Sequence, residues 1–423
     1  MIQLPHHNKQ LKAQFSSILR EIDPDSSSDA VCIDSIDIVL RQYLNIKEMR
    51  EAGSFFTGQE LATYLVSKFS KSITFDSVVV DPTCGAGNLL IECSRKLGVE
   101  QGLKKTLMKW GKSLRGYDIH ATFVEAAKLR LIIEALSRGV EKDCTLKEAL
   151  ELFPNIQAVD LMTLGAEEFN DVTHVAMNPP FCSWESPQKR FWRKGKVNAA
   201  GIVFEHLVNR LPEMCQVSAI LPDVLRSGSR YDNWRDFVSN KVQGKCEIYG
   251  RFSNNTDVDV FILSGALQFD ENRKIEWHKK SENKSVLSDF FRVCVGPLVA
   301  YRDPLDGDSK PFIHPKNSPA WGVMKNFTER RKYSGKLFKP PLIVIRRTSS
   351  PSDKFRAVGT IIKGKELVAI ENHMIVVQPI DGTVASCNQL IRTLKSQETN
   401  DFLNERIRLR HLTVGVVKQI PLR

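Results

Sequence analysis

The chain has 423 residues, 42% of them hydrophobic and 26% charged, which is an ordinary globular composition and excludes a mostly disordered or collagen-like chain. No apolar run approaches the roughly 20 residues that a membrane helix needs, and the first residues lack the apolar core of a secretory signal. Nine cysteines are scattered without a CxxC pair. This pattern favours a reducing cytosol over a disulfide framework or a zinc site, so no bound metal is expected.

The net charge of +11 is concentrated in the last third of the chain. Residues 1–270 have a balance of −2, whereas residues 271–423 contain 28 basic and 15 acidic side chains. A basic block beside a nearly neutral one predicts that one part of the chain binds a polyanion, and nucleic acid is the first candidate. The alternative is a basic surface that is only solvated.

The N-terminal part is predicted to be helical. Apolar residues at helical spacing indicate helices over residues 9–23 and 35–50. Thr57 and Glu60 match the two ends of a capping box, which predicts a further helix with Thr57 as its N-cap residue.

Strands and helices alternate after this point. The short apolar run at 77–80 is typical of a buried parallel strand, and helices are predicted over 88–97 and 120–138, the second ending at Gly139. Further strands are predicted at 114–118, 172–177, 217–221 and within 257–268. The basic segment 104–112 is interpreted as an inserted loop. The alternation predicts a doubly wound, Rossmann-like α/β sheet.

The alternation fades near residue 275. Short β-type runs follow, at 342–346, 367–370, 374–378 and 412–417. These runs predict a separate α+β or mostly β module. We therefore expect an N-terminal helical segment at 1–50, an α/β domain at 51–275 and a basic domain at 276–423.

Three groups of polar or glycine residues follow predicted strands: the loop from Asp81 to Gly87, Asp118, and the loop from Asn178 to Phe181. In open α/β sheets, ligands bind outside the carboxyl ends of the strands. The two glycines of the first loop permit close approach of a ligand, but Leu90 replaces the third glycine of a dinucleotide fingerprint. No phosphate-binding GK[ST] sequence follows. The coincidence of the three groups predicts one ligand site at this edge.

The acidic and amide residues suggest what this site binds. A carboxylate at Asp118 can accept hydrogen bonds from both hydroxyls of a ribose, and Asp160 can accept one from an adenine amino group. Asp118 could equally be an ordinary surface aspartate, and for Asp160 taken alone that is the better interpretation. In Asn178-Pro179-Pro180-Phe181, the prolines remove two donors, so the Asn178 side-chain oxygen and the Pro179 carbonyl offer two adjacent acceptors for a planar amino group. A simple turn after the strand is the alternative.

Five segments, taken in order, carry a resemblance to a known family. They are Phe55-Phe56-Thr57-Gly58, the loop from Asp81 to Leu90, Gly116-Tyr117-Asp118, Asp160 and Asn178-Pro179-Pro180-Phe181. Together they resemble S-adenosylmethionine-dependent DNA adenine-N6 methyltransferases of the gamma class, which includes modification subunits of type I restriction systems and type II enzymes. The resemblance covers roughly residues 50–270. The C-terminal third resembles a target-recognition domain only in position, size and charge.

The resemblance implies S-adenosylmethionine as the cofactor. The implied contact residues are Phe56, Thr57, Asp81, Pro82, Thr83, Cys84, Gly85, Gly87, Asn88, Asp118, Ile119, Asp160 and Leu161. Phe56 and Thr57 would contact the methionine end of the cofactor. Asp118 would bind the ribose hydroxyls, and Asp160 would meet the adenine amino group.

The resemblance assigns the catalytic role to Asn178, Pro179, Pro180 and Phe181. Asn178 and Pro179 would hold the N6 amino group of an adenine flipped out of double-stranded DNA, and Phe181 would stack on that base. Many relatives carry Tyr at the position of Phe181, a change that keeps stacking and loses a hydroxyl contact. Methyl transfer would be direct, without a metal or a covalent intermediate on the protein.

Two basic regions are candidates for DNA contact. One mixes aromatic and basic residues after the catalytic motif, and the other is the densest basic stretch of the C-terminal third. The candidate DNA-binding residues are Trp184, Trp192, Arg193, Arg330, Arg331, Lys332, Lys336, Lys339, Arg346 and Arg347. The implied setting is a restriction-modification or phage-defence system in the bacterial cytoplasm, near the nucleoid, with a separate restriction or specificity subunit as a further partner.

Two alternatives stay open. The same motifs would serve a methyltransferase that acts on an amino group of an RNA base or a protein side chain. The basic C-terminal part favours nucleic acid over protein and does not distinguish DNA from RNA. The second alternative is a non-catalytic, DNA-binding regulatory protein on the same fold, and the intact motifs count against it.

Overall fold

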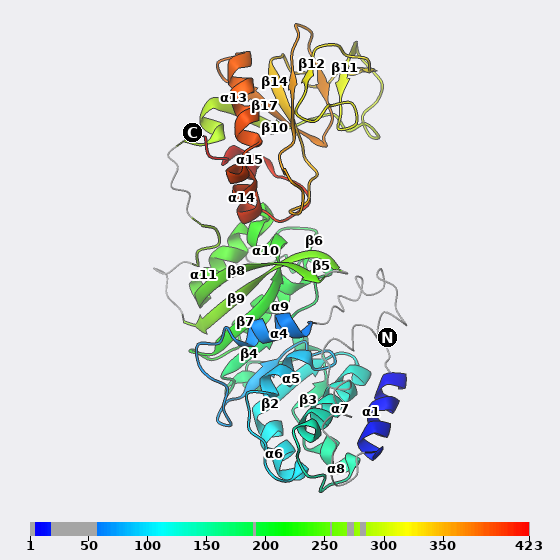
Figure 1. The fold of residues 1–423 in the computed structure, drawn as a ribbon, viewed down its shortest axis with the longest axis vertical. Helices are drawn as coiled ribbons and strands as arrows, with labels where there is room; N and C mark the ends of the chain where they lie inside the picture. The colour runs from blue at the N-terminus through cyan, green and yellow to red at the C-terminus, as the bar shows by residue number, and fades with distance from the viewer. Residues whose placement is uncertain are drawn as a thin grey trace. The chain divides into compact units, whose positions relative to one another are not determined.

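The structure is a computed structural model that describes residues 5–17, 57–188, 192–253, 256–268, 275–279 and 285–422. The chain divides into two compact units, Met1–Trp277 (unit 1) and His278–Arg423 (unit 2), each described by itself (Figure 1). The predicted helix at 35–50 and the predicted cofactor contact Phe56 lie outside the described residues.

Unit 1 is built on a seven-stranded sheet. Its strands lie in the order β3 (Ile156–Ala158), β2 (Leu114–Asp118), β1 (Val79–Asp81), β4 (His174–Met177), β7 (Gln216–Pro222), β9 (Thr256–Leu267) and β8 (Val242–Ser253). The first five are parallel, whereas β9 runs antiparallel to both β7 and β8. The strand order reverses between β1 and β4, and in α/β sheets such a reversal opens a crevice for a ligand.

Helices cover both faces of this sheet, as predicted for a doubly wound fold. Successive strand residues point to opposite faces, so Val79 of β1 joins one hydrophobic core and Val80 joins the other. The first core is closed by α4 (Gln59–Val66), α5 (Asn88–Ser94), α6 (Leu103–Ser113), α7 (Ala121–Ser137) and α8 (Leu146–Glu151). The second is closed by α9 (Ala199–Val208), α10 (Asp223–Ser227) and α11 (Asp232–Lys241).

Short elements complete unit 1. They are α1 (Pro5–Ser17), the 3-10 helices η2 (Leu161–Thr163), η3 (Glu167–Phe169) and η4 (Ser229–Tyr231), and the hairpin strands β5 (Ser183–Glu185) and β6 (Lys196–Asn198). Helix α1 is anchored to α7 by Asn8, whose side-chain amide donates hydrogen bonds to the Thr122 carbonyl over 3.0 Å and to Glu125 over 2.8 Å. No helix in the described ranges has both the length and the hydropathy needed to cross a membrane.

Two predictions for unit 1 are wrong. The segment 104–112 lies within α6 instead of a loop, because Leu103, Leu107 and Trp110 recur at helical spacing and are fully buried while its lysines face outward. Thr57 is not an N-cap residue: α4 begins after Gly58, and no side-chain hydrogen bond caps it. The capping-box pattern is therefore present in the sequence without its hydrogen bonds.

Unit 2 is an α+β unit, in keeping with the expected C-terminal module. A five-stranded sheet has the order β10 (Phe291–Val295), β17 (Met374–Pro379), β14 (Leu342–Arg346), β15 (Gly359–Ile362) and β12 (Val323–Met324). A three-stranded sheet has the order β13 (Arg330–Lys332), β11 (Ser309–Ile313) and β16 (Ala369–Ile370). The helices are α12 (Leu287–Phe290), α13 (Val384–Leu394), α14 (Gln397–Arg406) and α15 (Val414–Lys418).

The sheet of unit 2 also buries both faces. Ile343 and Ile345 of β14 join the core that contains residues of α13, α14 and α15, while Val344 joins a second core that includes Ile313 of β11. The strand predicted at 412–417 is wrong, because this segment forms α15. The Thr413 side chain accepts a hydrogen bond from the backbone N–H of Val416 over 3.3 Å and so caps a helix in a run that looks β-like.

Candidate active site

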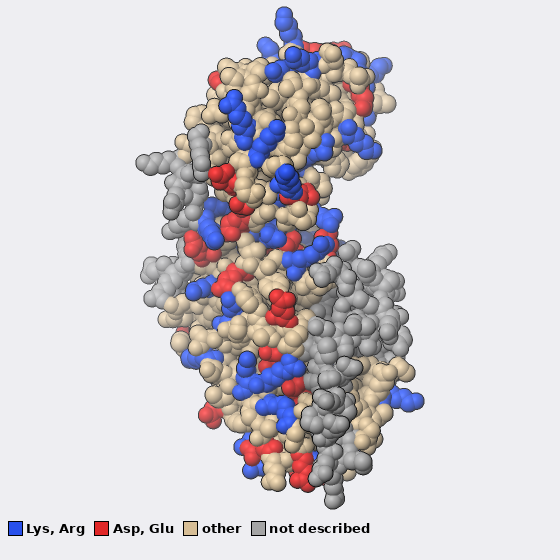
Figure 2. All heavy atoms as spheres, viewed as in Figure 1, with Lys and Arg blue, Asp and Glu red and all other residues tan. Residues whose placement is uncertain are grey.

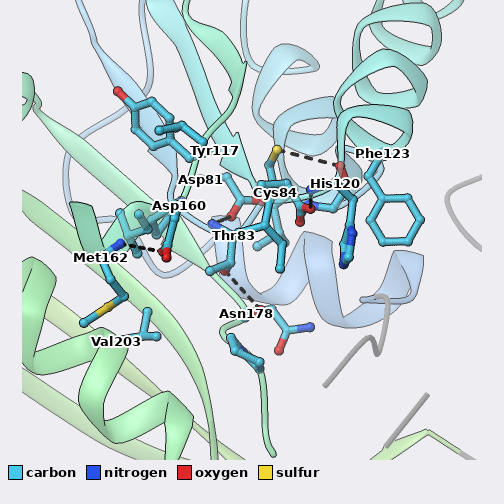
Figure 3. Close-up of a pocket in the computed structure, with 18 of the residues that line it drawn as sticks. Asp81, Thr83, Cys84, Tyr117, His120, Phe123, Asp160, Met162, Asn178 and Val203 are labelled. Atoms are coloured by element: carbon cyan, nitrogen blue, oxygen red, sulfur yellow. Dashed lines mark hydrogen bonds between the residues drawn. The ribbon is translucent and has the colours of Figure 1, made fainter. Parts of the chain in front are cut away.

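The carboxyl ends of β1, β2 and β4 surround one cavity of about 340 Å³, a volume in the range of small-molecule sites. The cavity is lined by Thr57, Asp81, Pro82, Thr83, Cys84, Gly85, Asn88, Leu89, Tyr117, Asp118, Ile119, His120, Phe123, Val159, Asp160, Leu161, Met162, Asn178, Pro180, Trp184 and Val203. Figure 3 shows Asp160 and His120 on opposite sides of this cavity and Asn178 on a third. Every described cofactor candidate except Gly87 lines it.

The loop after β1 is shaped by its glycines. Gly85 and Gly87 have φ angles of +51° and +83°, a region that other residues adopt at a cost. Gly87 is also the N-cap residue of α5, and a Cβ atom on it would lie 2.9 Å from Cβ of Ala127 on α7. The loop can therefore pass close to α7 and turn sharply into α5 only because glycine occupies this position.

Asp118 joins β2 to the glycine loop. Its Oδ2 atom accepts a hydrogen bond from the backbone N–H of Gly85 over 3.1 Å, and its Oδ1 atom accepts one from that of His120 over 2.8 Å. Asp81, at the end of β1, accepts a similar bond from the Thr83 backbone N–H over 3.2 Å. These backbone donors fix both carboxylates at the cavity wall.

The cavity therefore contains two carboxyl groups in a poorly solvated setting. Burial, opposed by the hydrogen bond from the Thr83 N–H and aided by the charge of Asp118, raises the pKa of Asp81 to about 8. Burial likewise raises the pKa of Asp118, against the hydrogen bond from His120. A cationic ligand would favour the ionised form of both groups, so the electrostatics of this cavity suit a positive charge.

The wall beside Asp118 is apolar. Ile119 is 63% exposed although it is a large hydrophobic residue, and it lines the cavity together with Phe123 and Leu161. Asp160 is exposed, and its Oδ1 atom accepts a hydrogen bond from the Met162 N–H over 2.9 Å. An exposed apolar side chain beside a carboxylate offers a flat ring both a packing surface and a polar edge contact.

The Asn178 loop is held by groups of the same cavity. The Asn178 side-chain nitrogen, Nδ2, donates a hydrogen bond to Thr57 Oγ1 over 3.0 Å. The backbone carbonyl of Asn178 accepts one from Thr83 Oγ1 over 3.3 Å, drawn as a dashed line in Figure 3. Pro179 is buried and Pro180 lines the cavity. Within the described ranges, no group donates a hydrogen bond to the Pro179 carbonyl. The Asn178 side-chain oxygen and the Pro179 carbonyl are thus two acceptors on adjacent residues.

Phe181 lies where the Asn178–Phe181 loop meets the β5–β6 hairpin. Its ring packs edge-on against that of Phe252, with centroids 5.6 Å apart and planes at 84°. The Asn198 side chain donates a hydrogen bond to the Phe181 carbonyl over 3.0 Å, and Trp184 of the hairpin lines the cavity. The aromatic residue of the motif is therefore partly buried and fixed from two sides.

Several residues of this cavity were not among the predicted site residues. Tyr117, His120, Phe123, Met162 and Val203 line the cavity. The first three flank Asp118 in the sequence, so proximity to that residue could have indicated them. Val203 comes from α9, and no sequence pattern indicates its place.

The candidate DNA-binding residues have varied surroundings. Trp192 is buried and donates a hydrogen bond to Glu205 over 2.7 Å, which is a core position. Trp184 lines the cavity, and Arg193 is exposed. Arg330 is paired with Glu366.

The other arginines of the basic stretch in unit 2 contact the chain itself. Arg331 donates hydrogen bonds to the carbonyls of Ala300 and Asp303, Arg346 donates one to that of Ser318, and Arg347 one to that of Asn372. Three lysines of this stretch are exposed and form no ion pair with a described acidic residue: Lys332, Lys336 and Lys339.

Comparisons with known proteins give one family match and several structural matches. Residues 31–229 match the family described as N-6 DNA Methylase. The type IIL restriction-modification enzyme MmeI, solved in complex with DNA, has 11% identity and a TM-score of 0.55, with 90% of this chain and 69% of that chain covered. This likeness confirms the predicted fold.

Two further structures are similar at lower TM-scores. The type IIG restriction endonuclease BpuSI has 14% identity and a TM-score of 0.46, with 93% of this chain covered, and this chain spans 60% of its length. The M protein of the type I restriction enzyme EcoKI has 14% identity and a TM-score of 0.35, with 63% of this chain and 62% of that chain covered. No curated protein matches the sequence significantly.

Proposed function

We propose, on the premise that residues 31–229 belong to the N-6 DNA methylase family, that the chain methylates N6 of adenine in double-stranded DNA. The methyl donor would be S-adenosylmethionine. The observation that carries this proposal is the meeting of Asp81, Asp118 and the Asn178–Phe181 loop at one cavity. One side of the cavity suits a cationic ligand with a ribose, and the other presents two acceptors to an amino group.

The residues of the cavity fit the proposed cofactor. Asp118 would accept hydrogen bonds from the ribose hydroxyls, and Ile119 would pack on the adenine ring, which accounts for its exposed apolar side chain. Asp81 and Thr57 would lie towards the methionine end. The ammonium and sulfonium charges of S-adenosylmethionine would favour the ionised form of the two buried carboxyl groups. When bound, this cofactor supplies an electrophilic methyl group.

The Asn178 loop would position the nucleophile. The Asn178 side-chain oxygen and the Pro179 carbonyl would each accept one N–H of the adenine amino group, which draws its lone pair towards the methyl carbon. Transfer would form a bond between N6 and that carbon and break the carbon–sulfur bond, and one N6 proton would leave to solvent. Phe181 would stack on the flipped base, held by Phe252. Positioning and electrostatics are the protein's contribution.

Unit 2 would bind the DNA backbone. Basic side chains are spread widely over the face of unit 2 that Figure 2 shows, and acidic ones are sparse there. Because the arginines at 330, 331, 346 and 347 contact the chain itself, we assign phosphate contact to the exposed lysines Lys332, Lys336 and Lys339. Arg193 and Trp184 would contact DNA near the flipped base. Trp192, a core residue, is left out of this assignment.

A methylation assay tests this proposal. The chain is incubated with radiolabelled S-adenosylmethionine and with unmethylated bacterial DNA, RNA or a protein mixture. We expect label in DNA alone, as for a modification enzyme of a restriction or phage-defence system in the bacterial cytoplasm. Label in RNA alone would contradict the DNA substrate, and cofactor binding without transfer to any substrate would favour a regulatory protein. Adding candidate restriction or specificity subunits would then show whether a partner is required.

A further inference from the structure

A continuous path of hydrogen bonds connects the interior of α7 to the catalytic loop. Arg130 of α7 is fully buried, and its Nη1 atom donates to the Ala86 carbonyl and to Asn88 Oδ1, each over 2.6 Å. Asn88 Nδ2 donates to the Thr57 carbonyl over 2.7 Å. Thr57 Oγ1 accepts the 3.0 Å hydrogen bond from Asn178. We call these four residues, Arg130, Asn88, Thr57 and Asn178, the Arg130 path.

The chemistry of the groups gives this path a direction. A guanidinium only donates hydrogen bonds, so it must face the oxygen of the Asn88 amide and not its nitrogen. The Asn88 nitrogen then faces the Thr57 carbonyl, which only accepts. Charge-assisted bonds at a fully buried site are strong, so the position of Thr57 is set from α7. Thr57 in turn holds the nitrogen side of the Asn178 amide.

We propose that Arg130 is a positioning residue for methyl transfer. Acting through Asn88 and Thr57, it holds Asn178 with its nitrogen on Thr57 and its oxygen on the opposite side of the amide, turned to the target amino group. This inference rests on the proposed function for the identity of that amino group. Asn88 and Thr57 line the cofactor cavity, whereas Arg130 does not. A change at Arg130 can therefore disturb Asn178 without removing a cavity-lining side chain.

The same helix provides a matched control. Arg138, at the C-terminal end of α7, donates hydrogen bonds to the carbonyls of Ser94 and Leu97 over 3.1 Å and 2.8 Å. It also links α7 to the segment around the end of α5, and none of its hydrogen bonds reaches Thr57 or Asn178. If Arg130 only holds helices together, its loss should lower stability without moving the Asn178 amide, as the loss of the half-buried Arg138 should.

The kinetic experiment compares Arg130→Met, Arg130→Lys and Arg138→Met with the unchanged chain in single-turnover methyl transfer to DNA. For Arg130→Met we expect a rate lower by on the order of 10- to 100-fold, with a cofactor Kd within about 3-fold of the original. Arg130→Lys, which keeps a buried donor, should recover part of the rate. Arg138→Met should stay within about 2-fold. Equal rate losses in the two Met variants, or no loss in Arg130→Met, would overturn the inference.

A second readout does not depend on activity. In protein labelled with 15N only at asparagine, the side-chain amide signals of Asn178 are identified by their loss in Asn178→Ala. We expect these signals to shift in Arg130→Met and to stay unchanged in Arg138→Met; unmoved signals in Arg130→Met would overturn the inference. If the chain transfers no methyl group to DNA, the proposed function fails while this measurement still decides the Arg130 path. If Arg130→Met does not fold, Arg130→Lys is used for both readouts.

Discussion

The backbone N–H of Gly85 donates a hydrogen bond to the Asp118 side chain over 3.1 Å, which joins the glycine loop after β1 to the end of β2. The two segments are 33 positions apart in the sequence. Through this bond a single carboxylate both shapes the loop and presents its remaining acceptor sites to the cavity. The contact makes Asp118 the residue whose replacement should most directly weaken cofactor binding.

We expect Asp118→Asn to lower affinity for S-adenosylhomocysteine by on the order of 10- to 100-fold, because hydrogen bonds to a charged group contribute about 1.5–3 kcal/mol. In Asp118→Asn, the side-chain NH2 group would also face one of the two backbone N–H donors, and two donors cannot form a hydrogen bond with each other. Isothermal titration calorimetry measures the change. Asp171→Asn is the control, since Asp171 is exposed and paired with Arg115 outside the cavity. Equal affinities of the two variants would contradict the ribose assignment.

The pKa of Asp81 predicts how stability depends on pH. Because burial raises this pKa to about 8 in the folded chain, the contribution of Asp81 to stability is fully present below its unfolded pKa of about 4 and is lost as the pH rises through about 8. The melting temperature of the ligand-free chain should therefore fall between about pH 5 and about pH 9 by more than that of Asp81→Asn. Parallel melting curves of the two proteins across this range would contradict the prediction.

Cofactor binding should reverse part of this loss, since a cationic ligand favours the ionised carboxylate. Affinity for S-adenosylmethionine is thus expected to rise as the pH increases towards about 8. Titrations at several pH values, with Asp81→Asn alongside, separate this effect from the titration of other groups. An affinity independent of pH would show that Asp81 does not face the positive charge of the ligand.

A comparison of Gly87 with Gly139 tests whether the close approach of the glycine loop to α7 requires glycine. Both have φ near +80°, but a Cβ on Gly87 would lie 2.9 Å from Cβ of Ala127, whereas nothing lies within 4 Å of one on Gly139. Gly139→Ala should cost about 1–2 kcal/mol of unfolding free energy from backbone strain alone. Gly87→Ala should cost about 1–3 kcal/mol more because of the clash. Urea unfolding measures both, and equal losses would contradict the packing argument.

The lysines of unit 2 are expected to contribute to DNA affinity by neutralising phosphates. Replacing Lys332, Lys336 and Lys339 by Ala should weaken binding and reduce the slope of log K against log salt by about 0.9 for each phosphate that is no longer neutralised. Fluorescence anisotropy with unmethylated DNA measures this slope. Arg330→Ala is the control, because Arg330 is paired with Glu366. A slope that changes only in the control would assign the phosphates to the arginines instead of the lysines.

The parts of this fold that were predictable from sequence are those with strong local signals. Strands β1 and β4 are buried between two layers of helices and are recognisable as short, mostly apolar runs, whereas β2 contains Arg115 and Gly116 and has a weaker pattern. Each of the three strands ends at or just before a residue of the cavity: Asp81, Asp118 and Asn178. Strand β8 was missed because most of its residues are only partly buried, which removes a clear apolar pattern. The local pattern also predicted a strand at 412–417, but Thr413 caps a helix there although the run is rich in valine.

Contacts between residues far apart in the sequence could not be predicted from local sequence patterns. The hydrogen bond between Thr57 and Asn178 spans 121 positions. Locally, Thr57 matches the N-cap position of a capping box, but in the structure its hydroxyl accepts the hydrogen bond from Asn178 and Gly58 is the N-cap residue. Trp192 follows basic residues and so resembles a DNA contact, but Glu205, thirteen positions later, accepts its indole N–H in the core. Such partners become visible only when the chain is folded.

In the proposed reaction, the Asn178–Phe181 loop positions adenine N6 for attack on the methyl group. The most direct measurement is mass spectrometry of nucleosides from unmethylated bacterial DNA after incubation with S-adenosylmethionine and either the unchanged chain or Asn178→Ala. We expect N6-methyladenine from the unchanged chain and a rate lower by on the order of 100- to 1,000-fold in Asn178→Ala, with cofactor affinity retained. Methylation of another base, or N6-methyladenine formed equally well by Asn178→Ala, would rule out this role of the loop.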